Sequence, residues 1–159
     1  MRKNQLTKEK TCAFYASDYH FEMISLPYIE KNLEDNKDII VLTENSLEDT
    51  MRTLISNINL KEEKKKKIIN INWKNDDLNK FKQIKEDIDK NKNMIIFIKG
   101  NKNYINNINE NIQKWVNKRE NVKIIDCYNI DEINNEMVDI IGKYQNVLSV
   151  RGETKIENK

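Results

Sequence analysis

The chain has 159 residues, of which 38% are hydrophobic and 34% are charged. This length is typical of one folded domain, and the apolar residues occur in runs, so the composition excludes a disordered chain. The 28 basic and 26 acidic residues leave a net charge of +2, too small to attract nucleic acid or an anionic membrane by charge alone. No apolar stretch approaches the about 18 to 20 residues that cross a bilayer, so we expect a cytoplasmic protein without membrane contact.

The first segment with a clear pattern is the continuous apolar run at residues 12–16, which is typical of a central strand covered on both faces. Residues 1–10 before it are charged and lack periodicity, so we expect a mobile N-terminal arm. Residues 38–44 contain IIVL and predict a second buried strand. An amphipathic helix lies between the two strands, and Ser17 or Asp18 is placed to cap it.

This first helix turns Phe21 and Ile24 inward and leaves Glu22 on the face toward water. Pro27 lies inside the helical pattern. Because proline removes one backbone donor and crowds the preceding turn, we expect a kink there or a break into two shorter helices.

Three further apolar runs, at residues 68–72, 94–98 and 122–127, predict strands three to five. Segments with helical spacing separate the runs, and the helix that begins at Asp77 places Leu78 in its inward stripe. This alternation predicts an α/β fold, namely a three-layer, doubly wound, mostly parallel sheet of about five strands with helices on both faces.

One α/β domain is expected over residues 11–150, followed by a polar C-terminal tail at residues 151–159. The order of the strands cannot be read from one sequence. A flavodoxin-like order and a RecA-like order both fit this series of elements.

The residues that follow the predicted strands form the candidate site, because ligands of open parallel sheets bind beyond the carboxyl ends of the strands, where the strand order reverses. Only some of them can converge, since the loops of edge strands lie far from the centre. The ligand-binding candidates are Ser17, Asp18, His20, Thr43, Glu44, Trp73, Lys99 and Tyr128, beside Asn45, Asn72, Gly100 and Asn129.

Several titratable residues in or near this set have side chains that could serve catalysis or bind a metal. His20 is the one histidine in the sequence, and histidine suits proton transfer near neutral pH, but at a helix start it more commonly has a structural role. Asp18, Glu44 and Asp126 offer the oxygen ligands that Mg²⁺ prefers, although acidic residues at such positions more commonly cap helices. We therefore expect no catalytic residue, no metal and no cofactor.

Missing motifs exclude several familiar chemistries. With three glycines in the sequence, neither GxxxxGK[ST] nor GxGxxG is present, which excludes a standard phosphate-binding loop. The GxSxG and HExxH motifs are also absent. Cys12 and Cys127 lie in separate apolar runs and are expected to be buried free thiols rather than zinc ligands.

The lysine-rich run at residues 61–67, with Trp73 and Lys74 nearby, offers a nucleic-acid interface as an alternative. Glu62 and Glu63 interrupt this run, and a charged run between two elements is usually a solvated connection. The sequence therefore argues against nucleic acid as a partner.

The first unit resembles the opening of the MEDS sensory domains, which combine a strand containing Phe-Tyr, a helix with a hydrophobic-Pro-aromatic-hydrophobic stretch and a second strand. The resemblance is carried by Phe14, Tyr15, Pro27, Tyr28, Leu33 and the IIVL run at residues 39–42. MEDS domains resemble RecA-type ATPase cores, including relatives of the circadian-clock ATPase, that have lost the phosphate loop. The resemblance implies a domain that senses or scaffolds without turning over nucleotide. The histidine that the family places just before the first strand is missing here.

We therefore expect a non-catalytic regulatory, sensory or ligand-binding domain of RecA-like type. One alternative is a small enzyme of flavodoxin- or Rossmann-like build that acts on a small polar substrate in a pocket lined by Asp18, Glu44, Lys99 and Tyr128. Another is an interaction module in which the helix around Trp115, or a neighbouring helix, presents an apolar face to a partner. A small-molecule ligand, a protein partner and a second copy of the chain all remain open as partners.

Overall fold

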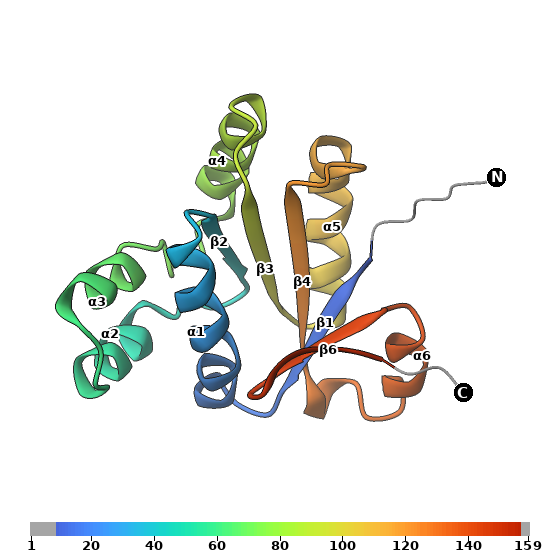
Figure 1. Ribbon diagram of the computed structural model, residues 1–159. Coiled ribbons are helices and arrows are strands. Elements are labelled where there is room, and N and C mark those ends of the chain that lie inside the picture. Colours follow the sequence, from blue (N-terminus) through green and yellow to red (C-terminus); the bar gives the residue numbers. More distant parts are fainter. Residues whose placement is uncertain (1–8, 157–159) are drawn as a thin grey trace.

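The computed structural model describes residues 9–156, so residues 1–8 of the expected arm lie outside the described part. Its six strands form one mostly parallel sheet with helices packed against it, which confirms the α/β class (Figure 1). The strand order is β2-β3-β4-β1-β5-β6, and only the pair β5–β6 is antiparallel. The strands are β1 Thr11–Tyr15, β2 Asp38–Thr43, β3 Met94–Gly100, β4 Val122–Asn129, β5 Asn146–Ser149 and β6 Gly152–Lys155.

Six α-helices and one short 3₁₀ turn are present within residues 9–156. None of these helices is both long enough and apolar enough to span a membrane. The helices are α1 Asp18–Glu34, α2 Glu48–Asn57, α3 Glu62–Ile69, α4 Asp77–Asp89, α5 Lys102–Val116 and α6 Met137–Ile141, and the 3₁₀ turn is η2 Ile130–Glu132.

Side chains alternate between the two faces of a strand, and this alternation gives the sheet two core clusters. Ile95 and Phe97 of β3 pack on one face with residues of α1, α2 and α3. Ile96 and Ile98 pack on the opposite face with residues of α4 and α5. We call these the α1 face and the α5 face. Every residue of β3 is buried, as expected for a strand between two neighbours.

Helix α1 begins as predicted and runs through Pro27 as one continuous helix, so the alternative of a break into two helices is wrong, while the alternative of a kink stays a prediction. Ser17 is its N-cap, with its hydroxyl oxygen accepting a hydrogen bond from the backbone N–H of His20. Ile24 and Ile29 on either side of the proline are almost completely buried. Burying such side chains contributes about 1.5 to 3 kcal/mol each, so the two together offset the about 3 kcal/mol that an interior proline costs.

The predicted third strand at residues 68–72 is wrong, because this segment belongs to α3 and the turn after it. The acidic side chains lie in the first turn of α3 and Lys66 and Lys67 in its last, an arrangement that suits the helix dipole. Ile68 is completely buried against the α1 face, and Lys64 reaches across to Glu30 of α1 at 2.9 Å. Helix pairing thus overrides the strand propensity of the isoleucines.

The expected strand count is also too low, because β5 and β6 were both missed, and β6 lies in the expected polar tail. Glu153 of β6 explains the order of this polar strand, because its carboxylate accepts hydrogen bonds from the Thr11 hydroxyl at 2.7 Å and from the Tyr28 hydroxyl at 3.4 Å, and it pairs with Lys123. Gly152 makes the turn between β5 and β6 with a φ of 104°, a conformation that favours glycine.

Strand β2 forms one edge of the sheet, and the buried Lys80 of α4 covers it. Its ammonium donates hydrogen bonds to the carbonyls of Val41 in β2 and of Lys74. Burial lowers the pKa of Lys80 to about 8. Leu78, expected to face inward, is instead 82% exposed, because α4 turns Lys80 toward the edge.

The two cysteines are buried free thiols, as predicted. Burial, followed by the neighbouring charge of Asp126, raises the pKa of Cys12 to about 12 and that of Cys127 well above its ordinary value. Neither thiol is therefore poised for thiolate chemistry.

Asp87 of α4 is buried beside Asp38 of β2, and one oxygen of its carboxylate has no hydrogen-bond partner. Burial, and then the hydrogen bond and charge of Asp38, raises the pKa of Asp87 from 3.8 to about 6. Between these two values the folded chain keeps a proton that the unfolded chain has released. The free energy of unfolding therefore falls as pH rises through this window.

We expect Asp87→Asn to remove this fall and to raise the free energy of unfolding at neutral pH by up to about 3 kcal/mol, since one unit of pKa corresponds to about 1.4 kcal/mol. Urea denaturation at intervals between about pH 4 and pH 7 measures both effects. Asp89→Asn, on the exposed side of the same helix, is the control. An equal gain in the two variants would contradict the role of buried Asp87.

Candidate functional site

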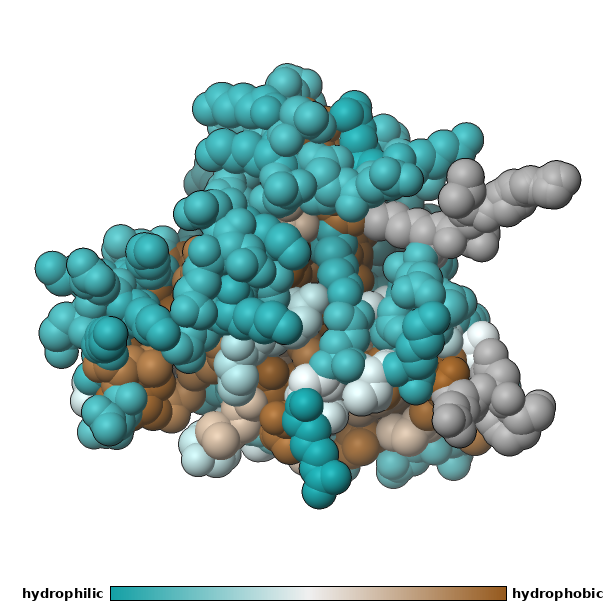
Figure 2. All heavy atoms as spheres, in the orientation of Figure 1, coloured by the Kyte–Doolittle hydropathy of each residue, from teal (hydrophilic) through white to brown (hydrophobic). Residues whose placement is uncertain are grey.

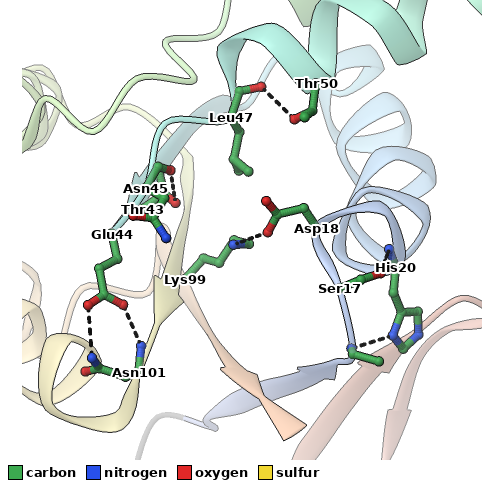
Figure 3. A network of polar contacts seen from close by, with 11 residues as sticks. Ser17, Asp18, His20, Thr43, Glu44, Asn45, Leu47, Thr50, Lys99 and Asn101 are labelled. Carbon is green, nitrogen blue, oxygen red and sulfur yellow. Dashed lines mark hydrogen bonds and ion pairs between the residues drawn. The ribbon is translucent and has the colours of Figure 1, made fainter. Parts of the chain in front are cut away.

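The carboxyl ends of β1, β2 and β3 bring together most of the candidate residues predicted from the sequence (Figure 3). Ser17, Asp18 and His20 follow β1, Thr43 and Glu44 end and follow β2, and Lys99 lies at the end of β3. We call this set of residues, together with Asn101, the rim. Two pairs of rim side chains bind each other, Asp18 with Lys99 and Glu44 with Asn101, and the other polar side chains of the rim bind backbone groups.

The centre of the rim is the ion pair between Lys99 and Asp18, whose Nζ and Oδ1 atoms are 2.9 Å apart. The Lys99 side chain is only 4% exposed, while that of Asp18 is 50% exposed. The ammonium also lies over two aromatic rings, 4.6 Å from the centroid of Tyr15 and 5.5 Å from that of Phe21. Carboxylate and ring faces together compensate for burying this charge.

Glu44 forms the second pair of the rim and binds Asn101, the N-cap residue of α5. Its carboxylate accepts hydrogen bonds from the backbone N–H of Asn101 at 3.0 Å and from the side-chain amide at 2.9 Å. Gly100 makes this close approach possible, because a Cβ atom there would lie 2.9 Å from Glu44 Oε1 and 2.7 Å from a ring carbon of Tyr104. The carboxylate of Glu44 thus binds at the N-terminus of α5, where negative charge suits the helix dipole.

Ser17 and His20 form hydrogen bonds in the turn after β1, at the start of α1. His20 Nδ1 accepts a hydrogen bond from the backbone N–H of Ala16 at 2.9 Å, while the His20 N–H donates to Ser17 at 3.1 Å. The hydrogen bonds of His20 are thus local ones that hold the start of α1. Thr43 is likewise occupied, since its hydroxyl donates to the carbonyl of Asn45 at 2.7 Å.

Trp73 and Tyr128 do not join the rim. Trp73 follows a helix instead of a strand, is 3% exposed and donates its indole N–H to the carbonyl of Ile68 at 2.8 Å. Tyr128 packs on the α5 face, where its hydroxyl lies 2.7 Å from that of Tyr144. The pocket expected between Asp18, Glu44, Lys99 and Tyr128 is therefore not formed, because the Tyr128 and Lys99 side chains lie on opposite faces of the sheet.

The oxygen ligands considered for Mg²⁺ are separated in the same way. Asp18 binds Lys99 and Glu44 binds Asn101, whereas Asp126 lies on the α5 face and accepts a hydrogen bond from Tyr144 at 2.6 Å. Within residues 9–156 no group of three or more histidine, cysteine or acidic side chains is arranged to hold a metal ion.

Glu22, which was expected to face water, is 2% exposed beneath the rim, and one of its carboxylate oxygens has no hydrogen-bond partner. Burial raises the pKa of Glu22, opposed by a hydrogen bond with Thr50 and by the charge of Lys99. One turn further along α1, the buried hydroxyl of Ser25 is also without a partner. The helical spacing of Asp18, Glu22, Ser25 and the buried Ile29 was the sequence signal that could have placed Glu22 on the inner side.

Removing the charge of Asp18 should show how much the ion pair with Lys99 contributes to the free energy of unfolding. In Asp18→Asn the buried ammonium of Lys99 keeps its aromatic neighbours but loses its carboxylate. We expect a loss of about 1 kcal/mol in the free energy of unfolding, a modest value because Asp18 is half exposed.

Asp49→Asn is the matched control, because Asp49 also lies in the first turn of a helix, and loses only the helix-dipole contribution. Chemical denaturation of both variants compares the two effects. Equal stability losses would show that Asp18 acts only on the helix dipole.

Comparison of the chain with protein-family models, with curated proteins and with solved structures finds no match.

Proposed function

We propose that this chain is a non-catalytic regulatory or ligand-binding domain with a RecA-like core that does not hydrolyse nucleotide. The observation that carries the proposal is the ion pair between Asp18 and Lys99 at the turn after β1. In nucleotide-binding α/β proteins, phosphate binds at the N-terminus of the helix after the first strand. Here a carboxylate of the chain itself lies in that first turn.

Asp18 thus takes the place of a bound anion, and Lys99 acts as its counter-ion. The backbone donors at this helix start are partly used as well, since the N–H of His20 binds the Ser17 hydroxyl and the N–H of Phe21 binds the Ser17 carbonyl. A phosphate entering here would meet a negative charge and find the nearby lysine already paired. This arrangement favours a domain with a fixed conformation over one that binds and hydrolyses nucleotide.

The strand order supports the RecA-like part of the proposal. Counted from the opposite edge, and leaving β6 aside, the order is β5-β1-β4-β3-β2, which is the order of RecA-like cores. A flavodoxin-like sheet has the order 2-1-3-4-5. The two core clusters, with α1 to α3 on one face and α4 and α5 on the other, support a doubly wound, three-layer arrangement.

The alternative readings have less support. The enzyme hypothesis has less support because Tyr128 lies on the opposite face of the sheet from Lys99, so the expected pocket does not form. The interaction hypothesis has less support at Trp115, because Phe81 of α4 packs edge-on against the Trp115 ring, with the two ring centroids 5.9 Å apart. Figure 2 shows apolar side chains along the lower part of the drawn face, near α2 and also toward the lower centre and right, while hydrophilic side chains cover the upper part. Self-association or a protein partner stays a prediction.

A nucleotide assay tests the proposal directly. The purified chain should release no phosphate from Mg-ATP or Mg-GTP, and pyrophosphate should not raise its melting temperature, because the anion position is filled by Asp18. Phosphate release that a rim substitution abolishes would overturn the proposal.

Asp18→Ser should create an anion-binding position that the natural chain lacks. It frees the Lys99 ammonium and the helix start, so pyrophosphate should now stabilise the variant, with a gain that rises with the logarithm of its concentration above Kd. Asp49→Ser, at the start of α2, should gain no such response. A natural chain that responds to pyrophosphate as strongly as Asp18→Ser would contradict the assignment of Asp18.

A further inference from the structure

A cavity of about 840 Å³ opens on the α5 face, well away from the rim. It lies between α5, β4 and the segments before β1 and after α6, and we call it the α5 cavity. Its volume is within the range of about 300 to 1,000 Å³ that small-molecule sites occupy. The cavity therefore has the size of a ligand site, and its chemistry indicates the ligand class.

The inner wall of the α5 cavity is a polar network centred on Asp126, which is only 7% exposed. Asp126 Oδ2 accepts a hydrogen bond from the Tyr144 hydroxyl at 2.6 Å, and Oδ1 accepts one from the Asn109 amide at 3.1 Å. The Tyr128 and Tyr144 hydroxyls are 2.7 Å apart. Burial raises the pKa of Asp126, while these hydrogen bonds and the charge of Lys10 oppose the rise.

The direction of these hydrogen bonds follows from counting protons. Tyr144 gives its one proton to Asp126, so Tyr128 must donate to Tyr144. Asn109 uses one N–H on Asp126 and its other on the carbonyl of Ile105 at 3.0 Å. All donors of these three side chains are spent within the protein, and the carboxylate of Asp126 retains lone pairs that can accept more.

A buried carboxylate in a central strand costs free energy that two hydrogen bonds return only in part. Such a group facing a cavity of ligand size is a common property of binding sites. The charged residues at the mouth, Glu9 and Glu110 against Lys10, Lys118 and Lys143, are all exposed and nearly balance one another. The inner wall therefore determines the preference for charge.

We propose that the α5 cavity binds a small organic cation whose protonated amine or amidine group donates hydrogen bonds to the carboxylate of Asp126. An anionic group would meet the carboxylate, and a neutral acceptor would find no donor among Tyr128, Tyr144 and Asn109. The adjoining tyrosine rings favour a cation further. This inference goes beyond the proposed function, because it concerns another face of the sheet and specifies a ligand class.

Three probes of nearly equal size and shape test the charge preference: benzamidine, which is cationic, benzamide, which is neutral, and benzoate, which is anionic. Titration of the full chain, followed by isothermal calorimetry and by NMR of the Asn109 side-chain amide, should show benzamidine binding in the millimolar range. Benzamide and benzoate should bind at least tenfold more weakly. Equal binding of the three probes, binding of benzoate alone, or no binding of benzamidine to the folded chain would overturn the proposal.

Two variants locate the site. Asp126→Asn keeps the size of the side chain and should weaken benzamidine binding at least tenfold, whereas Glu110→Gln, which removes a carboxylate from the mouth, should change it less than twofold. Gln113→Trp, an exposed position of α5 that lines the cavity, should block entry without disturbing the core.

If Asp126→Asn does not fold, Gln113→Trp decides, because undiminished benzamidine binding by that variant contradicts a site in this cavity. Equal effects of Asp126→Asn and Glu110→Gln contradict the role of the inner carboxylate. These results are independent of the nucleotide assay, because none of these variants touches Asp18 or Lys99.

Discussion

The ion pair of Asp18 and Lys99 connects the start of α1 to the end of β3 across the carboxyl edge of the sheet. Lys99 is nearly buried between Tyr15 and Phe21, so its charge needs a counter-charge in place at all times. The side chain of Asp18 supplies that charge from within the chain. The two charges at this edge of the sheet therefore neutralise each other within the chain.

Alternation of side chains along the strands decides which polar groups meet. In β3 it turns Lys99 toward the α1 face, and in β4 it turns Asp126 and Tyr128 toward the α5 face. The chain thus has two polar clusters back to back, separated by the sheet. The first is closed by its own partners, whereas the second leaves a carboxylate directed at a cavity. Binding on the α5 face would leave the rim intact, which suits a domain that recognises a ligand without reacting with it.

Long apolar runs made strands β1 to β4 predictable to within one or two residues, because such runs suit strands that are buried on both faces of a sheet. The isoleucines near residue 69 misled for the same reason, since the capping charges of α3 and its packing on α1 determined the outcome there. Strand β6 was missed because it is polar. Its order depends on Glu153 binding Thr11, which lies 142 residues earlier in the chain.

The candidate site was predictable in membership but not in pairing. Asp18, Glu44 and Lys99 all stood among the residues at the strand ends, yet one sequence does not tell which strands are neighbours or which face a side chain takes. Tyr128 was included because it follows the same rule, although its face separates it from the others. Glu22 was missed since a glutamate is seldom buried, although its helical spacing from Ile29 pointed inward, toward Thr50 of α2 and Lys99 of β3.

The state of the Lys99 ammonium can be observed directly by NMR of its ¹⁵Nζ and attached protons. A paired and buried ammonium should give a signal that exchanges slowly with water, that stays unchanged when Mg-ATP is added in excess, and that is lost in Asp18→Asn. A Lys99 signal that is already in fast exchange in the natural chain, or one that shifts and saturates as Mg-ATP is added, would contradict the proposal that Asp18 takes the place of a bound anion.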